Sequence, residues 1–128
     1  MKEKYSCIFI LLISCICLMS CKNQDKNILR EDEIVSIFKS NGMNCEMTKM
    51  QESRSEHFPF GGSIKIIEIS GEEIFIFQYN NEKKVQNELS QDFIHEEGLI
   101  YYKNNVIFLY RGKNQKIISI LTSNLKVT

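Results

Sequence analysis

Two pairs of short apolar runs constrain the fold of this chain most. The first pair, residues 64–69 and 74–79, flanks Ser70-Gly71-Glu72-Glu73, and the second pair, residues 99–103 and 106–111, flanks Asn104-Asn105. Both pairs are rich in β-branched and aromatic residues, which favour strands, and Gly and Asn tolerate the positive φ of tight turns. The sequence therefore predicts two β-hairpins.

Three amphipathic segments predict helices at residues 30–40, 82–90 and 114–124. The first has an acidic start, which suits a helix N-terminus, and Asn41-Gly42 favours a left-handed cap at its end. Residues 43–49 alternate between apolar and polar side chains, which predicts a half-buried strand. The expected fold is α+β, an antiparallel sheet of about five strands with helices packed on one face, in the order α-β-ββ-α-ββ-α.

The chain also contains an internal similarity. At an offset of 32, residues 74–89 align without gaps on residues 106–121, so that Val85 meets Ile117 and Leu89 meets Leu121. The match is one of hydrophobic type more than of identity. It indicates two similar strand–helix units without proving a duplication.

A charged and then apolar leader precedes the expected domain. Lys2 and Lys4 begin it, and its apolar stretch covers about 13 residues, against the ~20 that span a bilayer as a helix. We therefore expect an export signal. Its end, Leu18-Met19-Ser20-Cys21, resembles the lipobox of bacterial lipoproteins, which implies cleavage before Cys21 and a diacylglyceryl group on its thiol. The alternative is an ordinary secretory signal, with Cys21 a plain thiol.

The resemblance divides the chain into a signal peptide at residues 1–20, a lipidated tether at 21–29 and one α+β domain at 30–128. It implies a place on the extracytoplasmic face of the cell membrane, or on an outer membrane where the source has one. Loss of the leader leaves 14 basic and 15 acidic residues. Because no excess of positive charge remains, we expect no nucleic-acid partner and no electrostatic membrane contact beyond the lipid.

Several segments of the domain also resemble a group of small bacterial lipoproteins without an assigned activity. These segments are Phe58-Pro59-Phe60 followed by Gly, Gly71-Glu72 before Phe77-Gln78-Tyr79, and the run from Tyr101 to Gly112. The similarity covers most of residues 57–125, although the segment 91–98 is shorter than is usual in that group. The resemblance implies the order of elements and export, and it carries over no catalytic residue.

Residues that could perform chemistry are few. His57 and His95 are the two histidines of the chain, and they lie 38 positions apart. With the leader cysteines removed and Cys21 lipidated, Cys45 is the one remaining thiol, and it occupies an apolar position of the strand predicted over 43–49. We expect Cys45 to be a small buried hydrophobe and both histidines to be loop residues. No metal or other cofactor is predicted, and the recognised enzyme signatures are absent from the sequence.

Aromatic residues offer a possible contact surface. Phe58 and Phe60 flank Pro59 in a loop, where they would either contact a partner or fold back over the end of the sheet; the second arrangement is favoured because a small domain needs its large side chains for the core. Tyr101 and Tyr102 must alternate faces, one inward and one outward. The candidate contact surface is therefore Phe58, Phe60, Tyr101 and Tyr102.

The sequence is compatible with two classes of function. The favoured one is a lipid-anchored, non-enzymatic module that binds an unknown envelope protein or ligand. The alternative is a small envelope hydrolase or thiol-dependent enzyme that uses His57, His95 or Cys45.

Overall fold

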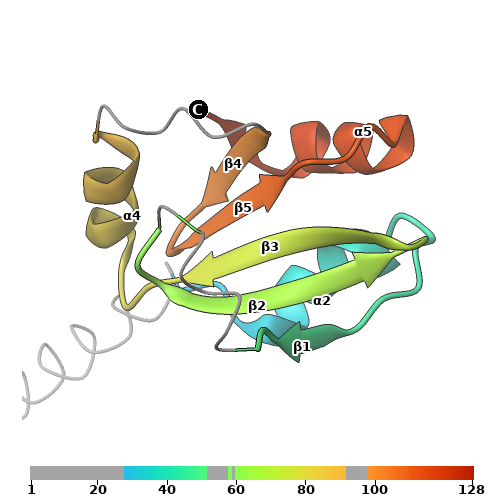
Figure 1. Ribbon diagram of the computed structural model, residues 1–128, viewed down its shortest axis with the longest axis horizontal. Coiled ribbons are helices and arrows are strands. Elements are labelled where there is room, and N and C mark those ends of the chain that lie inside the picture. The colour runs from blue at the N-terminus through green and yellow to red at the C-terminus, as the bar shows by residue number, and fades with distance from the viewer. Residues whose placement is uncertain (1–27, 52–57, 59, 92–97) are drawn as a thin grey trace, which may run out of the picture.

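A computed structural model describes residues 28–51, 58, 60–91 and 98–128 of the chain. Its strands are β1 (Met47–Lys49), β2 (Ser63–Ile69), β3 (Glu72–Gln78), β4 (Leu99–Lys103), β5 (Val106–Tyr110) and β6 (Lys126–Val127), and its helices are α2 (Glu31–Lys39), α4 (Glu82–Leu89) and α5 (Gln115–Asn124). All described strands belong to one antiparallel sheet, in the order β1-β2-β3-β5-β4-β6 (Figure 1).

The predicted α+β class and the predicted order of elements are confirmed. The described sheet has six strands, one more than expected, because β6 pairs with the edge of β4. β6 is two residues long and directly follows α5. A segment this short has no measurable alternation, so the sequence pattern could not show it.

Both predicted hairpins form, and the turn of the first is tighter than its runs suggested. Ser70 and Gly71 alone connect β2 to β3, with φ of 54° and 79°. Glu72 and Glu73, which were expected in this turn, are therefore the first residues of β3. In the second hairpin Asn104 adopts the positive φ, 51°. Two-residue turns with positive φ match the right-handed twist of the strands that they join.

The helices begin and end within one residue of their predicted limits. The backbone N–H of Arg30 donates to Glu33 Oε2 at 2.8 Å, which satisfies a donor at the start of α2. Gly42, with φ of 78°, follows the end of α2. Asn81 and Asn114 cap α4 and α5 by accepting hydrogen bonds from backbone N–H groups of the first turn.

The strand predicted over residues 43–49 is regular only from Met47 to Lys49. Met43 and Cys45 are nevertheless buried, as their apolar positions suggested. Leu29 is buried as well, although the sequence placed it in the tether. The packed domain therefore begins one residue earlier than expected.

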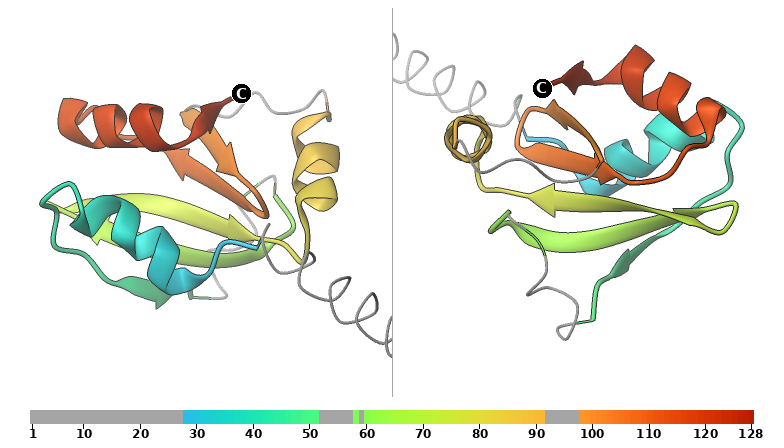
Figure 2. Two further views of the ribbon diagram at one scale, coloured as in Figure 1. Left: turned by 180° about the vertical axis from the view of Figure 1, so that it is seen from behind. Right: turned by 45° about the horizontal axis from the view of Figure 1, so that its top comes forward.

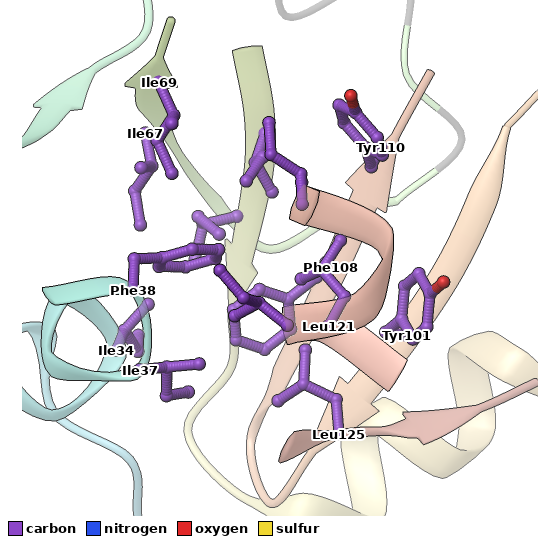
Figure 3. Packing of buried hydrophobic residues seen from close by; sticks show 14 of the residues in the cluster. Ile34, Ile37, Phe38, Ile67, Ile69, Tyr101, Phe108, Tyr110, Leu121 and Leu125 are labelled. Carbon is purple, nitrogen blue, oxygen red and sulfur yellow. The ribbon is translucent and has the colours of Figure 1, made fainter. Parts of the chain in front are cut away.

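Two hydrophobic clusters lie on opposite faces of the sheet. Ile74 and Ile76 of β3 point to the cluster that α2 and α5 cover, and Figure 3 shows Phe38 of α2 and Leu121 of α5 meeting there. Phe75 and Phe77 of β3, which alternate with them, belong to the other cluster. Alternation along one central strand thus divides the core in two.

The expectation that all helices pack on one face holds for α2 and α5 and is wrong for α4. Val85 of α4 is fully buried in the cluster opposite α2 and α5, and α4 stands apart from those two helices in both views of Figure 2. The aligned positions Val85 and Ile117 therefore lie on opposite faces of the sheet. The similarity between the two strand–helix units extends to their strands and not to the side on which the helix packs.

Candidate functional site

Cys21, His57 and His95 lie outside the described residues, so their predicted roles stay predictions. Within residues 28–51, 58, 60–91 and 98–128, no three metal-binding side chains of the types His, Cys, Asp and Glu gather into a possible site. No helix in the same ranges is long and apolar enough to cross a bilayer.

Cys45 is buried in the cluster under α2, with 4% of its surface exposed. Burial raises the pKa of its thiol, and the positive charge of Lys39 opposes this rise only in part. A nucleophilic cysteine needs the opposite shift, because the thiolate is the reactive form. The prediction of a buried, structural Cys45 is confirmed, and thiol chemistry at this residue finds no support in its surroundings.

Phe58 and Phe60 fold back over the sheet, as the favoured interpretation held. The ring of Phe58 lies 4.7 Å from that of Phe75, and the ring of Phe60 lies 5.0 Å from that of Phe77, between centroids. The guanidinium carbon of Arg111 stands 5.1 Å from the Phe58 centroid, within the range of a cation–π contact. Phe60 is buried and Phe58 is half-buried, so Phe60 is not available as a contact residue.

Tyr101 and Tyr102 divide between the two faces of β4 as predicted. Tyr101 is the inward one, only 2% exposed, and its hydroxyl lies 3.2 Å from Thr122 Oγ1 of α5. Tyr102 is half-buried, and Lys126 Nζ stands 5.8 Å from its ring centroid. The candidate contact surface is therefore corrected: Tyr101 and Phe60 are core residues, because their rings fill the two clusters beside the sheet.

A buried asparagine, Asn105, connects the start of the domain at Leu29 to the β4–β5 turn. Asn105, in the β4–β5 turn, is 3% exposed. Its Oδ1 accepts from the backbone N–H of Leu29 at 2.6 Å, and its Nδ2 donates to the carbonyl of Tyr79 at 2.9 Å. Its own carbonyl accepts from the N–H of Tyr79 at 2.8 Å. This cluster is structural, since every polar group of Asn105 named here is paired within the chain.

A concave surface lies between α2 and the segment 45–47, and we call it the edge groove. Its volume is about 430 Å³ and its lining is mostly apolar. Cys45 and Met47 line it from the strand side, and Val35 lines it from the helix. Four charged residues surround it. Glu31, Asp32 and Lys39 come from the two ends of α2, and Glu46 directly precedes β1.

The position of the edge groove follows from local structure. Val35 lies beside the core-facing residues Ile34, Ile37 and Phe38 and is only partly buried. β1 is the terminal strand of the sheet, so one of its edges pairs with β2, and its first residue, Met47, lines the groove. An ion pair between Lys65 of β2 and Glu31 holds the start of α2 over this edge. The arrangement offers an apolar floor, a charged rim and an adjacent strand edge, which together suit the binding of a protein segment.

Sequence reasoning missed this groove, although one signal was present. The apolar face of the first helix was assigned to Ile34, Ile37 and Phe38, which leaves Val35 as an apolar residue beside that face. An unexplained apolar residue next to a short edge strand can mark a contact surface. No pattern in the sequence, however, indicates that α2 and β1 lie next to each other.

Comparisons with known proteins add no assignment to this geometry. No family model, no curated protein and no solved structure matches the chain.

Proposed function

We propose that this chain is a lipid-anchored bacterial lipoprotein whose α+β domain serves as a binding module on the extracytoplasmic side of a membrane. The segment Leu18-Met19-Ser20-Cys21, which follows an apolar leader, carries the proposal. Cleavage before Cys21 would leave its thiol at the mature N-terminus. Two acyl chains on one residue anchor a protein stably, whereas one chain binds only marginally.

The arrangement of the domain supports this reading. The core begins at Leu29, so the seven residues 22–28 separate it from Cys21. Even fully extended, they reach about 25 Å, at ~3.3–3.6 Å per residue. The domain would therefore work close to the bilayer. Cys45, buried in the core, would not compete for the lipid.

The edge groove supports the binding role. It combines an apolar lining with a charged border and lies beside the terminal strand β1. This combination suits the recognition of a protein more than the turnover of a small substrate, because the groove holds no paired nucleophile and base among its lining residues.

Metabolic labelling with a fatty acid tests the anchor. We expect the full-length chain to incorporate label and to fractionate with membranes, and Cys21→Ser to lose both properties. Cys45→Ala is the matched control, since it removes a buried thiol and should leave the label unchanged. Label that persists in Cys21→Ser would contradict lipid attachment at this residue.

A further inference from the structure

The edge groove adjoins the start of β1, because Met47, the first residue of that strand, lines it. β1 is the last strand of the sheet, and within the described residues no strand pairs with its outer edge. Unpaired N–H and C=O groups on such an edge are a template for another strand. The groove adds an apolar lining, to which Val35 of α2 and Met47 of β1 contribute.

α2 and β1 run in opposite directions along this side. Glu31, at the start of α2, pairs with Lys65, which lies opposite Lys49 at the end of β1. Lys39, at the end of α2, is close enough to Cys45 to act on its thiol electrostatically. Figure 2 shows the same antiparallel course in its left view. The middle of α2, at Val35, is therefore level with the start of β1, at Met47.

This geometry is compatible with a two-fold axis. An axis that passes between Val35 and its symmetry mate would place α2 antiparallel to the α2 of a second copy. It would also place β1 antiparallel to the β1 of that copy, since β1 follows the same line in the opposite direction. One axis thus permits both helix packing and strand pairing, which is the self-complementarity that an isologous dimer requires.

The charges along α2 match this arrangement. The first turn of α2 exposes Glu31 and Asp32, and its last turn exposes Lys39. Antiparallel packing about Val35 brings Asp32 of each copy near Lys39 of the other. Within the described residues Lys39 has no ion-pair partner, while Asp32 has one weak contact, at 3.6 Å, with the exposed Arg30. Complementary charges at both ends fix the register of such an interface and disfavour the parallel arrangement.

We propose that the edge groove binds a second copy of this chain, which extends the sheet across the two β1 edges and packs the two α2 helices together. The proposal names the partner of the binding module proposed above, and it does not depend on lipid attachment at Cys21. Anchoring in one membrane would favour the dimer, because confinement of both copies raises their effective concentration.

Disulfide crosslinking of the full-length protein in membranes tests this pairing. Val35→Cys places a thiol beside the proposed axis, and oxidation should give a band at twice the mass of the chain on a non-reducing gel. Ser119→Cys, an exposed position of α5, is the matched control and should remain monomeric under the same conditions. The unmodified chain should also remain monomeric, because Cys45 is buried and the proposed processing removes the three leader cysteines and lipidates Cys21.

Charge reversal makes the test specific. Lys39→Glu in the Val35→Cys protein should reduce the dimer band at least several-fold, and addition of Asp32→Lys should restore it. Equal crosslinking of Val35→Cys and Ser119→Cys, or a Val35→Cys protein that stays monomeric, would overturn the proposal. A crosslinked band at any mass other than twice that of the chain would assign the groove to a different protein and would overturn it as well.

The same variants separate this proposal from the anchor itself. In the Cys21→Ser background the fatty-acid label should be lost, while Val35→Cys should still crosslink at raised protein concentration, and more strongly than Cys21→Ser alone, which controls for the cysteines of an uncleaved leader. Failure of labelling with retained crosslinking would remove only the anchor. Retained labelling without crosslinking would remove only the dimer.

Discussion

At the scale of single residues, Asn105 connects parts of the domain that lie far apart in the sequence. It joins the segment before α2, the end of β3 and the β4–β5 turn through hydrogen bonds of 2.6 to 2.9 Å. Because Asn105 is buried, water cannot replace its two side-chain hydrogen bonds when the side chain is removed. The cluster therefore fixes the position of Leu29, where the packed domain begins.

Asn105→Ala should destabilise the domain clearly. It leaves the N–H of Leu29 and the carbonyl of Tyr79 without their partner, and each unpaired buried group costs about 1–3 kcal/mol. We expect the free energy of unfolding to fall by about 2–4 kcal/mol in a urea titration. Asn44→Ala, at an exposed position, should change it by less than about 0.5 kcal/mol. Equal effects of the two substitutions would argue against a structural role for Asn105.

The sequence predicted some of these residues and not others, for a physical reason. The burial of Cys45 and the opposite faces of Tyr101 and Tyr102 follow from strand alternation, which is a local property. Asn105 was expected only to tolerate a turn. Its role in the cluster depends on Leu29, which lies 76 positions away, and no local pattern reports such a contact.

At the scale of elements, Tyr110 links β5 to two other parts of the chain. Its hydroxyl donates to the carboxylate of Glu72 at the start of β3 and accepts from the N–H of Asn114, at 2.9 Å, before α5. The ring itself is fully buried, and Figure 3 shows it on the same side of β5 as Phe108. Burial first, and then the hydrogen bond to Glu72, raise the pKa of Tyr110 above its ordinary value of 10.0.

This shift predicts a loss of stability at alkaline pH. The unfolded chain releases the Tyr110 proton near pH 10.0, whereas the folded chain holds it to higher pH. The contribution of Tyr110 to stability is therefore complete below pH 10 and falls as the pH rises beyond it. Burial and the nearby Glu88 carboxylate also raise the pKa of Tyr79, so this residue contributes in the same direction.

Tyr110→Phe isolates the contribution of one hydroxyl. We expect a loss of about 1–3 kcal/mol at pH 7, because the N–H of Asn114 loses its acceptor. Above pH 10 the further decline should be shallower than in the unmodified protein, since Tyr110 no longer contributes and, of the described residues, Tyr79 and Cys45 still have raised pKa values. Urea midpoints measured from pH 8 to pH 11 give both quantities. Parallel curves for the two proteins would contradict the role assigned to Tyr110.

The helices and hairpins were largely predictable from the sequence. The face of the sheet on which each helix packs was less predictable. The periodicity of apolar residues gave α2, α4 and α5 to within one residue and gave both hairpins. The face that α4 covers was predicted wrongly, because Val85 has the same hydrophobic pattern whichever face its helix packs on. That choice depends on the path of the connections around the sheet, which periodicity does not encode.

At the scale of the whole molecule, the proposed lipid anchor and the proposed pairing of two copies at the edge groove are compatible. The proposed tether of seven residues would hold the domain near the bilayer, where two copies would meet through α2 and β1. Both faces of the sheet are filled by the two hydrophobic clusters. A partner in this account therefore binds at the edge of the sheet and not on its faces.

Lipid attachment at Cys21 is tested by measuring the mass of the mature N-terminus. Trypsin should release Cys21-Lys22 from membrane-extracted protein, and mass spectrometry should find this dipeptide with a glyceryl thioether that carries two acyl chains. A peptide with an unmodified Cys21 would contradict the account, as would one that begins upstream of Cys21.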